Sequence, residues 1–390
     1  LVAQIDTGAQ SSQPVVVFNS LGWQRTGPVA IERPDLIKLR VVNAAGKAMR
    51  IQREGTRWLF LAEDVPAYGY KTFWYEEAGS YVTGEPEGEP EATPQRLENR
   101  FHRIELDDAG EIRAWYDKEN ERHVLADGET GNQLRLFDDR PHNWDAWEID
   151  ADYRETLQPL RDVHSIDVLE KGPVRAAVRI RRKTARSEII QKIVLWAHSP
   201  RVDFETEIDW HESHKLLKAA FPLAVRAMEA TYETAFGHVR RPTHTNTPRD
   251  AAMFEVPAHR WADLSEDGGG AALLNDCKYG YDARAHVLSL TLLRSPKDPD
   301  PETDMGSHRF TYSLLPHDGD FRRAGVIRQG YELNTPLLSR EVEIDRVGEA
   351  LRAIDPIWDV LFPEEQRRIA QLLVEEITVS TSGIDIRFRT

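Results

Sequence analysis

Alternation of apolar and polar residues with a period of two is the feature that most limits how this chain can fold. Between residues 97 and 338 the alternation recurs in short runs separated by turn residues, as in Val174–Ile180, Ile189–Trp196 and Phe310–Leu314. A period of two is that of a β-strand with one buried face. No long amphipathic helical pattern interrupts this region, so residues 97–338 predict a large two-sheet β-sandwich.

The segments before this region predict two further units. Residues 13–76 contain short strand patterns separated by turn residues such as Gly22 and Pro66, which predict a small β-sandwich. Residues 77–96 are rich in Glu, Pro and Gly and have few apolar side chains to bury. They predict an extended acidic linker or a long edge loop.

The tail, residues 339–390, changes from a strand pattern to a helical one. Pro363 followed by two glutamates is typical of a helix start. Apolar residues then recur at helical spacing, at Ile369, Leu372, Leu373 and Ile377. We therefore expect one amphipathic helix, with helix concentrated in 345–377. Two β-rich runs around Ser382-Gly383 predict a hairpin after it.

Composition excludes several classes of partner. The formal net charge of −15 opposes binding to a nucleic-acid backbone. No run of 18 apolar residues occurs, so we expect no membrane-spanning segment. The single cysteine, Cys277, cannot form an internal disulfide, and we expect it to be a small buried hydrophobe beside Leu273 and Leu274.

The chemistry-bearing residues concentrate in the stretch from Gly131 to Tyr153. It opens as a strand and then becomes a loop around Pro141 with acidic, basic and aromatic residues: Asp138, Asp139, Arg140, His142, Trp144, Asp145, Trp147 and Asp150. Tryptophan rings stack on the C–H faces of sugars, and carboxylates accept hydrogen bonds from hydroxyl groups. Two tryptophans beside several carboxylates therefore form a composition typical of a sugar-binding loop. The alternative is a surface loop whose tryptophans anchor it to the core and whose Arg140 pairs with a neighbouring aspartate.

Two other segments invite a functional interpretation. Gly237–Thr247 contains a polar cluster that could face a substrate or another domain, or could be a solvated loop: Arg240, Arg241, Thr243, His244 and Asn246. The HESH of His211–His214 lacks the spacing that places two imidazoles on one helix face, so we interpret it as structural. We assign no catalytic residue and no metal ligand.

A series of segments resembles, in order, the bacterial and cytosolic-type α-mannosidases of glycoside hydrolase family thirty-eight. They cover about residues 1–338 and include VVVFNSLGW (15–23), LENRFHRIELDDAGEI (97–112), GNQLRLFDDRPHNWDAWEID (131–150), DWHESHKLLKAAFPL (209–223), FGHVRRPTHTNT (236–247) and GYELNTPLL (330–338). The resemblance implies that residues 1–12 end a preceding helical domain. It also implies a large β supersandwich of the kind seen in galactose mutarotases.

The resemblance implies a retaining mechanism with an aspartate nucleophile and a divalent metal, usually zinc. Both would lie in an α/β domain before Leu1, so we expect no cofactor in this chain and no activity from it alone. The β domains would form one wall of the active site. On this basis we predict substrate contact for one set of residues, with Arg140 orienting a carboxylate: Asp138, Asp139, Arg140, Trp144, Asp145, Trp147, Arg241, Thr243 and His244.

The expected partners are an α-mannoside or oligosaccharide and the preceding catalytic domain, in the cytoplasm, with homo-oligomer formation left open. The tail 341–390 resembles the C-terminal end of large serine recombinases in its LFPEEQ run. We interpret it as a foreign tail joined near Leu338–Glu341; an unusual family-specific ending is the alternative. A stand-alone carbohydrate-binding or assembly module is the second functional hypothesis, and a DNA-associated protein the third.

Overall fold

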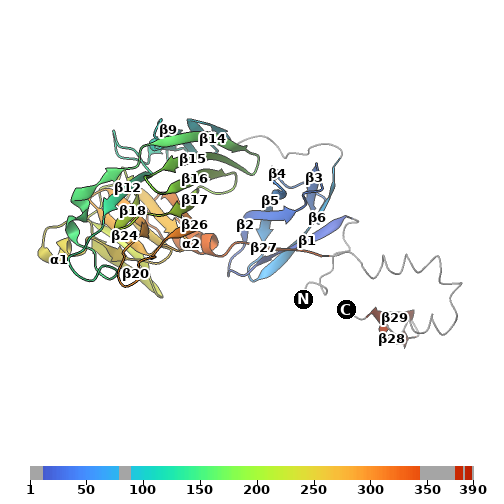
Figure 1. Ribbon diagram of the computed structural model, residues 1–390. Coiled ribbons are helices and arrows are strands. Elements are labelled where there is room, and N and C mark those ends of the chain that lie inside the picture. Colours follow the sequence, from blue (N-terminus) through green and yellow to red (C-terminus); the bar gives the residue numbers. More distant parts are fainter. Residues whose placement is uncertain (1–11, 79–88, 343–373, 381–382, 389–390) are drawn as a thin grey trace.

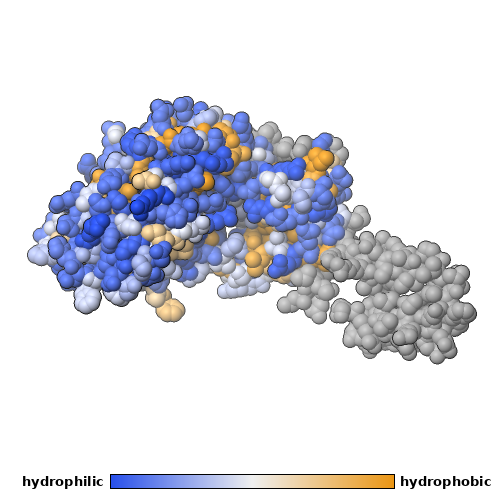
Figure 2. Space-filling model, viewed as in Figure 1, coloured by the Kyte–Doolittle hydropathy of each residue, from blue (hydrophilic) through white to orange (hydrophobic). Residues whose placement is uncertain are grey.

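The structure, a computed structural model, describes residues 12–78, 89–342, 374–380 and 383–388. In these residues the chain is mainly β, which confirms the predicted fold class. Figure 1 shows a small β body near the N-terminus and a larger β body beside it. The face in Figure 2 is largely hydrophilic over the larger body, as expected where strands alternate between core and solvent.

The small body packs a four-stranded sheet on a three-stranded sheet. The first has the order β27-β1-β6-β3 and consists of Leu338–Glu341, Gln13–Asn19, Gly69–Glu77 and Leu39–Asn43. The second has the order β2-β5-β4 and consists of Arg25–Glu32, Arg57–Val65 and Ile51–Glu54. Their inner faces share one apolar core, which includes Val15, Val17, Ile31, Trp58, Phe60 and Phe73.

The large body is built on a nine-stranded and a six-stranded sheet. The nine-stranded sheet has the order β14-β15-β16-β17-β26-β23-β22-β19-β20 and consists of Val163–Lys171, Arg175–Lys183, Glu188–Trp196, Val202–Trp210, Gly306–His317, Gly269–Asn275, Trp261–Glu266, Glu229–Thr234 and Gly237–Pro242. The six-stranded sheet has the order β13-β12-β18-β25-β24-β21 and consists of Gln158–Pro159, Gln133–Asp138, Lys215–Pro222, Val287–Arg294, Gly280–Arg284 and Val256–Pro257.

A smaller sheet, which shares the apolar core of the large body, and short helices complete this part of the structure. A five-stranded sheet in the order β11-β10-β9-β8-β7 consists of Arg122–His123, Ile112–Asp117, His102–Leu106, Arg96–Glu98 and Glu91–Thr93. The helices among the described residues are the 3₁₀ helix η2 and the α-helices α1 and α2, which span Ala151–Thr156, Pro248–Ala251 and Val326–Asn334. In the described part of the chain, no helix has the length and apolar character needed to cross a lipid bilayer.

The two large sheets meet through aromatic side chains at their centres. Phe204 of β17 stacks on Tyr312 of β26, with ring centroids 4.9 Å apart. Phe221 of β18, in the opposite sheet, lies 5.5 Å from Phe204 between ring centroids. The Tyr312 hydroxyl donates to Asn132 Oδ1 (2.6 Å) and accepts from Gln191 Nε2 (2.7 Å), so the buried hydroxyl keeps its hydrogen bonds.

Two predictions about individual segments are wrong. The second half of the predicted linker 77–96 contains β7 and the start of β8, because Ala92 and Leu97 supply buried apolar side chains. The prediction of no long amphipathic helix in residues 97–338 stands, because α2 has only nine residues. The strand β27 lies at the supposed start of the tail, yet it pairs with β1 of the small body.

The predicted tail helix lies mostly outside the described residues. Where the structure describes it, residues 374–377 belong to strand β28 (Val374–Ser380), so the helical prediction is wrong there. This strand pairs with β29 (Gly383–Phe388), with Ile377 opposite Ile386 and Val379 opposite Ile384. The β-branched residues favour the strand, and the predicted hairpin is confirmed.

The small and large bodies are joined by an apolar contact and a charged one. Leu59 and Leu61 of β5 belong to a buried cluster with Val174, Ala177, Val194, Trp196 and Ala197 of the large body. Beside it, Arg175 of β15 is 4% exposed and contacts three carboxylates: Glu54 Oε1 of the small body (2.5 Å), Glu170 Oε1 (2.7 Å) and Glu205 Oε1 (2.9 Å).

We predict that Arg175→Gln lowers the free energy of unfolding by about 3 kcal/mol, the lower end for a broken buried ion pair, because Glu170 loses its cation while Glu54 and Glu205 keep Arg57 and Lys192. Urea denaturation measures this. Arg179→Gln, on the same strand but in a more exposed pair with Asp167, should cost less than about 1 kcal/mol. Equal losses in the two variants would show that the junction cation has no special role.

The loss of unfolding free energy caused by Arg175→Gln should also depend on pH. Burial raises the pKa of Glu54, but Arg175 and Arg57 outweigh it and hold that pKa below its usual value. A depressed carboxyl pKa stabilises the fold above the unfolded-state pKa, and this stabilisation disappears as the pH falls through the folded-state pKa. The difference between wild type and Arg175→Gln should therefore narrow in acid.

Candidate functional site

The acidic and aromatic loop, residues 139–150, connects β12 to η2. Asp138 is the last residue of β12 and lies opposite Lys215 of β18 in the strand register. The Asp138 carboxylate accepts a hydrogen bond from Lys215 Nζ at 2.6 Å. The predicted binding residue at the start of the loop is therefore tied to the neighbouring strand.

Arg294, the last residue of β25, holds the centre of the loop. Its guanidinium pairs with the Asp139 carboxylate and donates to the carbonyl oxygens of Asp145 (2.9 Å), Ala146 (3.0 Å) and Glu148. Asp139 is only 1% exposed, and burial raises the pKa of this carboxyl although Arg294 opposes the shift. Asp139 is therefore a positioning group and does not present its carboxylate to solvent.

Arg140 does not orient a carboxylate as predicted. It is exposed, and within the described residues it makes no hydrogen bond or ion pair. Arg294 takes that role from 155 residues further along the chain. Sequence proximity favoured Arg140, whereas the pairing of β18 with β25 brings Arg294 to the loop.

Asp145 fixes the loop to a second segment. Its carboxylate accepts from the backbone N–H groups of Lys297 (2.6 Å) and Asp298 (3.1 Å), and His214 Nδ1 lies 3.4 Å away. Burial raises the pKa of Asp145, but these backbone hydrogen bonds outweigh it and lower that pKa. The ionised carboxylate therefore anchors the loop.

Trp144 and Trp147 are the exposed aromatic residues of the loop. They are 66% and 67% exposed, and their ring centroids lie 6.4 Å apart in an edge-to-face arrangement. Trp144 has a φ of 55°, a left-handed conformation that is strained for a tryptophan. Its carbonyl oxygen accepts from the N–H groups of Trp147 (2.7 Å) and Glu148 (3.0 Å). A clamped turn thus presents two large rings to solvent.

The aspartates of this loop are held by other groups of the protein. Asp138, Asp139 and Asp145 are each engaged by a different partner, and together they secure the base of the loop. Contact with a sugar remains a prediction for all the residues of the set. The two tryptophans are the aromatic members of the set, and both are exposed.

The second predicted set lies elsewhere. Arg241 of β20 donates to the Pro257 carbonyl oxygen (3.1 Å) and covers the ring of Tyr232. Thr243 is buried and donates to the Ala227 carbonyl oxygen at 2.6 Å. Thr243 and His244 line a pocket of about 450 Å³ to which the 139–150 loop contributes no residue.

Sequence reasoning missed a buried charged cluster on the six-stranded sheet. Lys218 is 2% exposed and lies between the carboxylates of Glu255 and Asp282, while the Tyr153 hydroxyl donates to Glu255 (2.5 Å). Burial opposes the charge of Lys218, but the two carboxylates hold its pKa above the usual value. The four residues come from separate segments, so no local motif could have revealed them.

The sequence also singled out the histidines of His211–His214 and the single cysteine, Cys277. In the ranges that the structure describes, no group of three or more His, Cys, Asp or Glu is arranged to hold a metal ion. His211 Nε2 contacts Asp209 at 2.9 Å. Cys277 is exposed, contrary to the prediction of a buried hydrophobe, because it follows the end of β23. Desolvation raises its pKa to about 11, which disfavours the reactive thiolate.

We predict that Arg294→Gln releases the loop, because Asp139 loses its cation and three carbonyl oxygens lose their donor. Hydrogen exchange should become faster in residues 139–150 while β16 and β17 keep their protection. Arg140→Gln, on the same loop, is the matched control and should leave exchange unchanged. Unchanged exchange in the Arg294 variant would contradict the clamp.

Comparison with known proteins identifies the family. The model of the glycosyl hydrolases family 38 C-terminal domain matches residues 97–302. The chain is 40% identical over 342 residues to human alpha-mannosidase 2C1, an alignment that covers 86% of this chain and 31% of the relative. It is 44% identical over 245 residues to alpha-mannosidase G of Dictyostelium discoideum, which covers 61% of this chain and 22% of that protein.

A solved structure shows the same fold. The crystal structure of an alpha-mannosidase from Enterococcus faecalis matches with a TM-score of 0.69 and 16% identity, over 87% of this chain and 47% of that one. The chain thus spans about a third of the human relative or less than half of the bacterial structure. The family match over residues 97–302 covers more than half of the chain, and the chain belongs to glycosyl hydrolase family 38.

Proposed function

We propose that this chain is the C-terminal β portion of an α-mannosidase that releases terminal α-linked mannose. The observation that carries this proposal is the 40% identity over 342 residues to a relative named alpha-mannosidase 2C1. Because the chain spans 31% of that relative, we place the nucleophile, the acid/base group and a divalent metal such as zinc in a preceding domain. We assign the role of nucleophile, acid/base group or metal ligand to no residue of this chain.

The role proposed for this chain is one wall of the mannoside site. Support comes from the 139–150 loop, in which Arg294 and Asp145 hold the backbone while Trp144 and Trp147 stay exposed. Large apolar side chains on a rigid turn lose little conformational entropy when a ligand binds. The rings would stack on the C–H face of a sugar and keep water from the bond to be cleaved.

The wall role implies an α-mannoside or oligosaccharide as substrate and the preceding catalytic domain as partner. Resemblance to the cytosolic-type enzymes supports a cytoplasmic location. We propose no role in the reaction for the recombinase-like tail. A homo-oligomer would be compatible with the wall role.

We predict that the 390-residue chain alone does not hydrolyse an aryl α-mannoside, with or without added zinc. The carboxylates of its loop are engaged in ion pairs or backbone hydrogen bonds, so they are not arranged as an acid and nucleophile pair. Release of the aryl group, measured by absorbance, tests this. Zinc-dependent turnover by the pure chain would mean that the active site lies within it.

In the protein that joins this chain to the catalytic domain, Trp144→Ala and Trp147→Ala should each lower kcat/KM for an aryl α-mannoside more than about tenfold, or about 1.4 kcal/mol. Metal content should not change. The matched control is Tyr279→Ala, because Tyr279 is 61% exposed but lies outside the loop. Full activity in both tryptophan variants would make the loop a surface feature only.

A further inference from the structure

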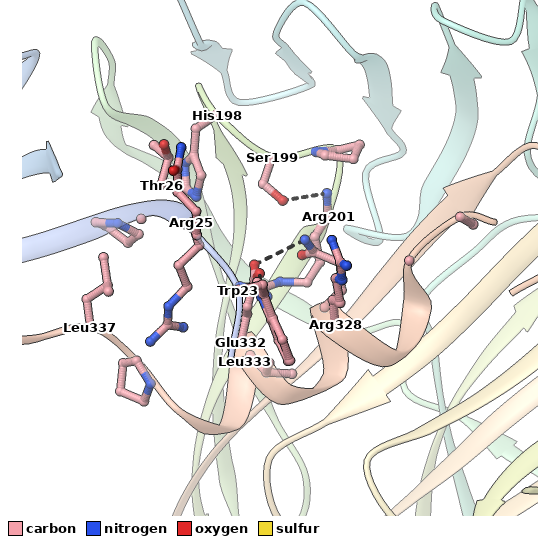
Figure 3. Close-up of a pocket in the computed structure, with 18 residues that line it drawn as sticks. Trp23, Arg25, Thr26, His198, Ser199, Arg201, Arg328, Glu332, Leu333 and Leu337 are labelled. Carbon is pink, nitrogen blue, oxygen red and sulfur yellow. Dashed lines mark hydrogen bonds between the residues drawn. The ribbon is translucent and has the colours of Figure 1, made fainter. Parts of the chain in front are cut away.

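A cavity of about 410 Å³ lies at the junction between the small and the large body (Figure 3). Its walls come from the start of β2, from the turn between β16 and β17 and from α2. Ligand pockets in proteins commonly have volumes of about 300–1,000 Å³. The cavity is therefore large enough for a small molecule, and two separately packed bodies contribute to it.

Arg25 supplies a donor without a protein acceptor. Its side chain is 7% exposed; Nε donates to Asn19 Oδ1 (3.0 Å) and Nη1 to the Thr335 carbonyl oxygen (2.7 Å). The buried Nη2 has no hydrogen-bond partner in the described part of the chain. Buried guanidinium donors are normally satisfied, so the Nη2 of Arg25, a residue that lines the cavity, is a donor still free to bind an acceptor.

The charged groups around the cavity carry one more positive than negative charge, with three arginines against Glu332 and Asp203. Arg201 and Arg328 also line it, while its carboxylate, Glu332, accepts from Trp23 Nε1 at 2.7 Å. Desolvation and the neighbouring Arg201 lower the pKa of His198 to about 4, and the buried Nδ1 of this ring has no protein partner among the described residues. Asp203 offsets the charge of Arg201, to which it is bonded at 2.7 Å.

The cations approach the cavity from different elements. Figure 3 shows Arg25 on the side of the small body, with Arg201 and Arg328 across from it on the large body. Gly325, at the N-terminal end of α2, also lines the wall, where the helix dipole adds partial positive charge. Arginine forks match the paired oxygens of carboxylates and phosphates.

We propose that the junction cavity binds the phosphate or carboxylate group of a small anionic ligand, with Arg25 Nη2 and the guanidinium of Arg328 as donors. Gln24 and Gln329 line the same cavity and supply further polar groups for the rest of the ligand. A ligand held there contacts both bodies, so its binding stabilises their junction. This site is independent of the mannoside wall and does not require the proposed function.

Isothermal titration of the complete chain with inorganic phosphate, and separately with acetate at the same ionic strength, tests the proposal. We expect saturable binding of at least one anion. Arg328→Gln should weaken it by about tenfold, because one charge-assisted hydrogen bond is lost. Arg25→Lys keeps the charge but removes the fork, and should weaken binding by at least as much.

Arg309→Gln is the matched control, because it removes one positive charge from an exposed side chain outside the cavity. This variant should bind within about twofold of wild type, since exposed charges act weakly at a distance in salt. Thermal melting shows whether each variant is folded, and Arg328 is exposed enough for its replacement to leave the fold intact.

Binding of phosphate alone identifies a phosphate site, binding of acetate alone a carboxylate site, and binding of both a general oxyanion site; each supports the proposal. No saturable binding of either anion would overturn it. Equal weakening by Arg328→Gln and Arg309→Gln would also overturn it, because binding would then follow net charge and not the cavity.

Discussion

The rest of the structure depends on the apolar contact between the nine-stranded and six-stranded sheets. Phe204, Tyr312 and Phe221 fill its centre, and the surrounding positions are almost all aliphatic or aromatic. Burial of this surface is the main favourable term for a sandwich of this size. The hydrogen bonds of Tyr312 to Asn132 and Gln191 add specificity, because a shift of one residue in either sheet would leave buried polar groups unpaired.

A fixed register places side chains at the ends of strands with little freedom. Arg294 closes β25 opposite Leu216, two residues after the bulge at Leu292 in the pairing with β18. From that position its guanidinium meets Asp139 and the loop carbonyl oxygens. The loop is thus held by the sheet through one cation, and the strained backbone of Trp144 persists because the surrounding contacts determine it.

The junction between the bodies combines the same two kinds of interaction. Leu59 and Leu61 bury apolar area against the large body, while Arg175 places its charge among three glutamates. In the junction cavity, by contrast, not every arginine donor has an acceptor, and Arg25 Nη2 has no hydrogen-bond partner among the described residues. A docking surface can therefore be well packed in one part and keep a charged cavity in another.

Local pattern determined the fold class, the family and the loop that carries the exposed tryptophans, because period-two alternation and contiguous motifs are properties of neighbouring residues. It did not determine which side chains meet. Arg294 is 155 residues from Asp139, and the strand β27 pairs with β1 although the whole large body lies between them. Residues 374–377 had helical spacing, yet pairing with β29 made them a strand. Sheet pairing joins residues that are remote in sequence, so only the tertiary structure decided these contacts.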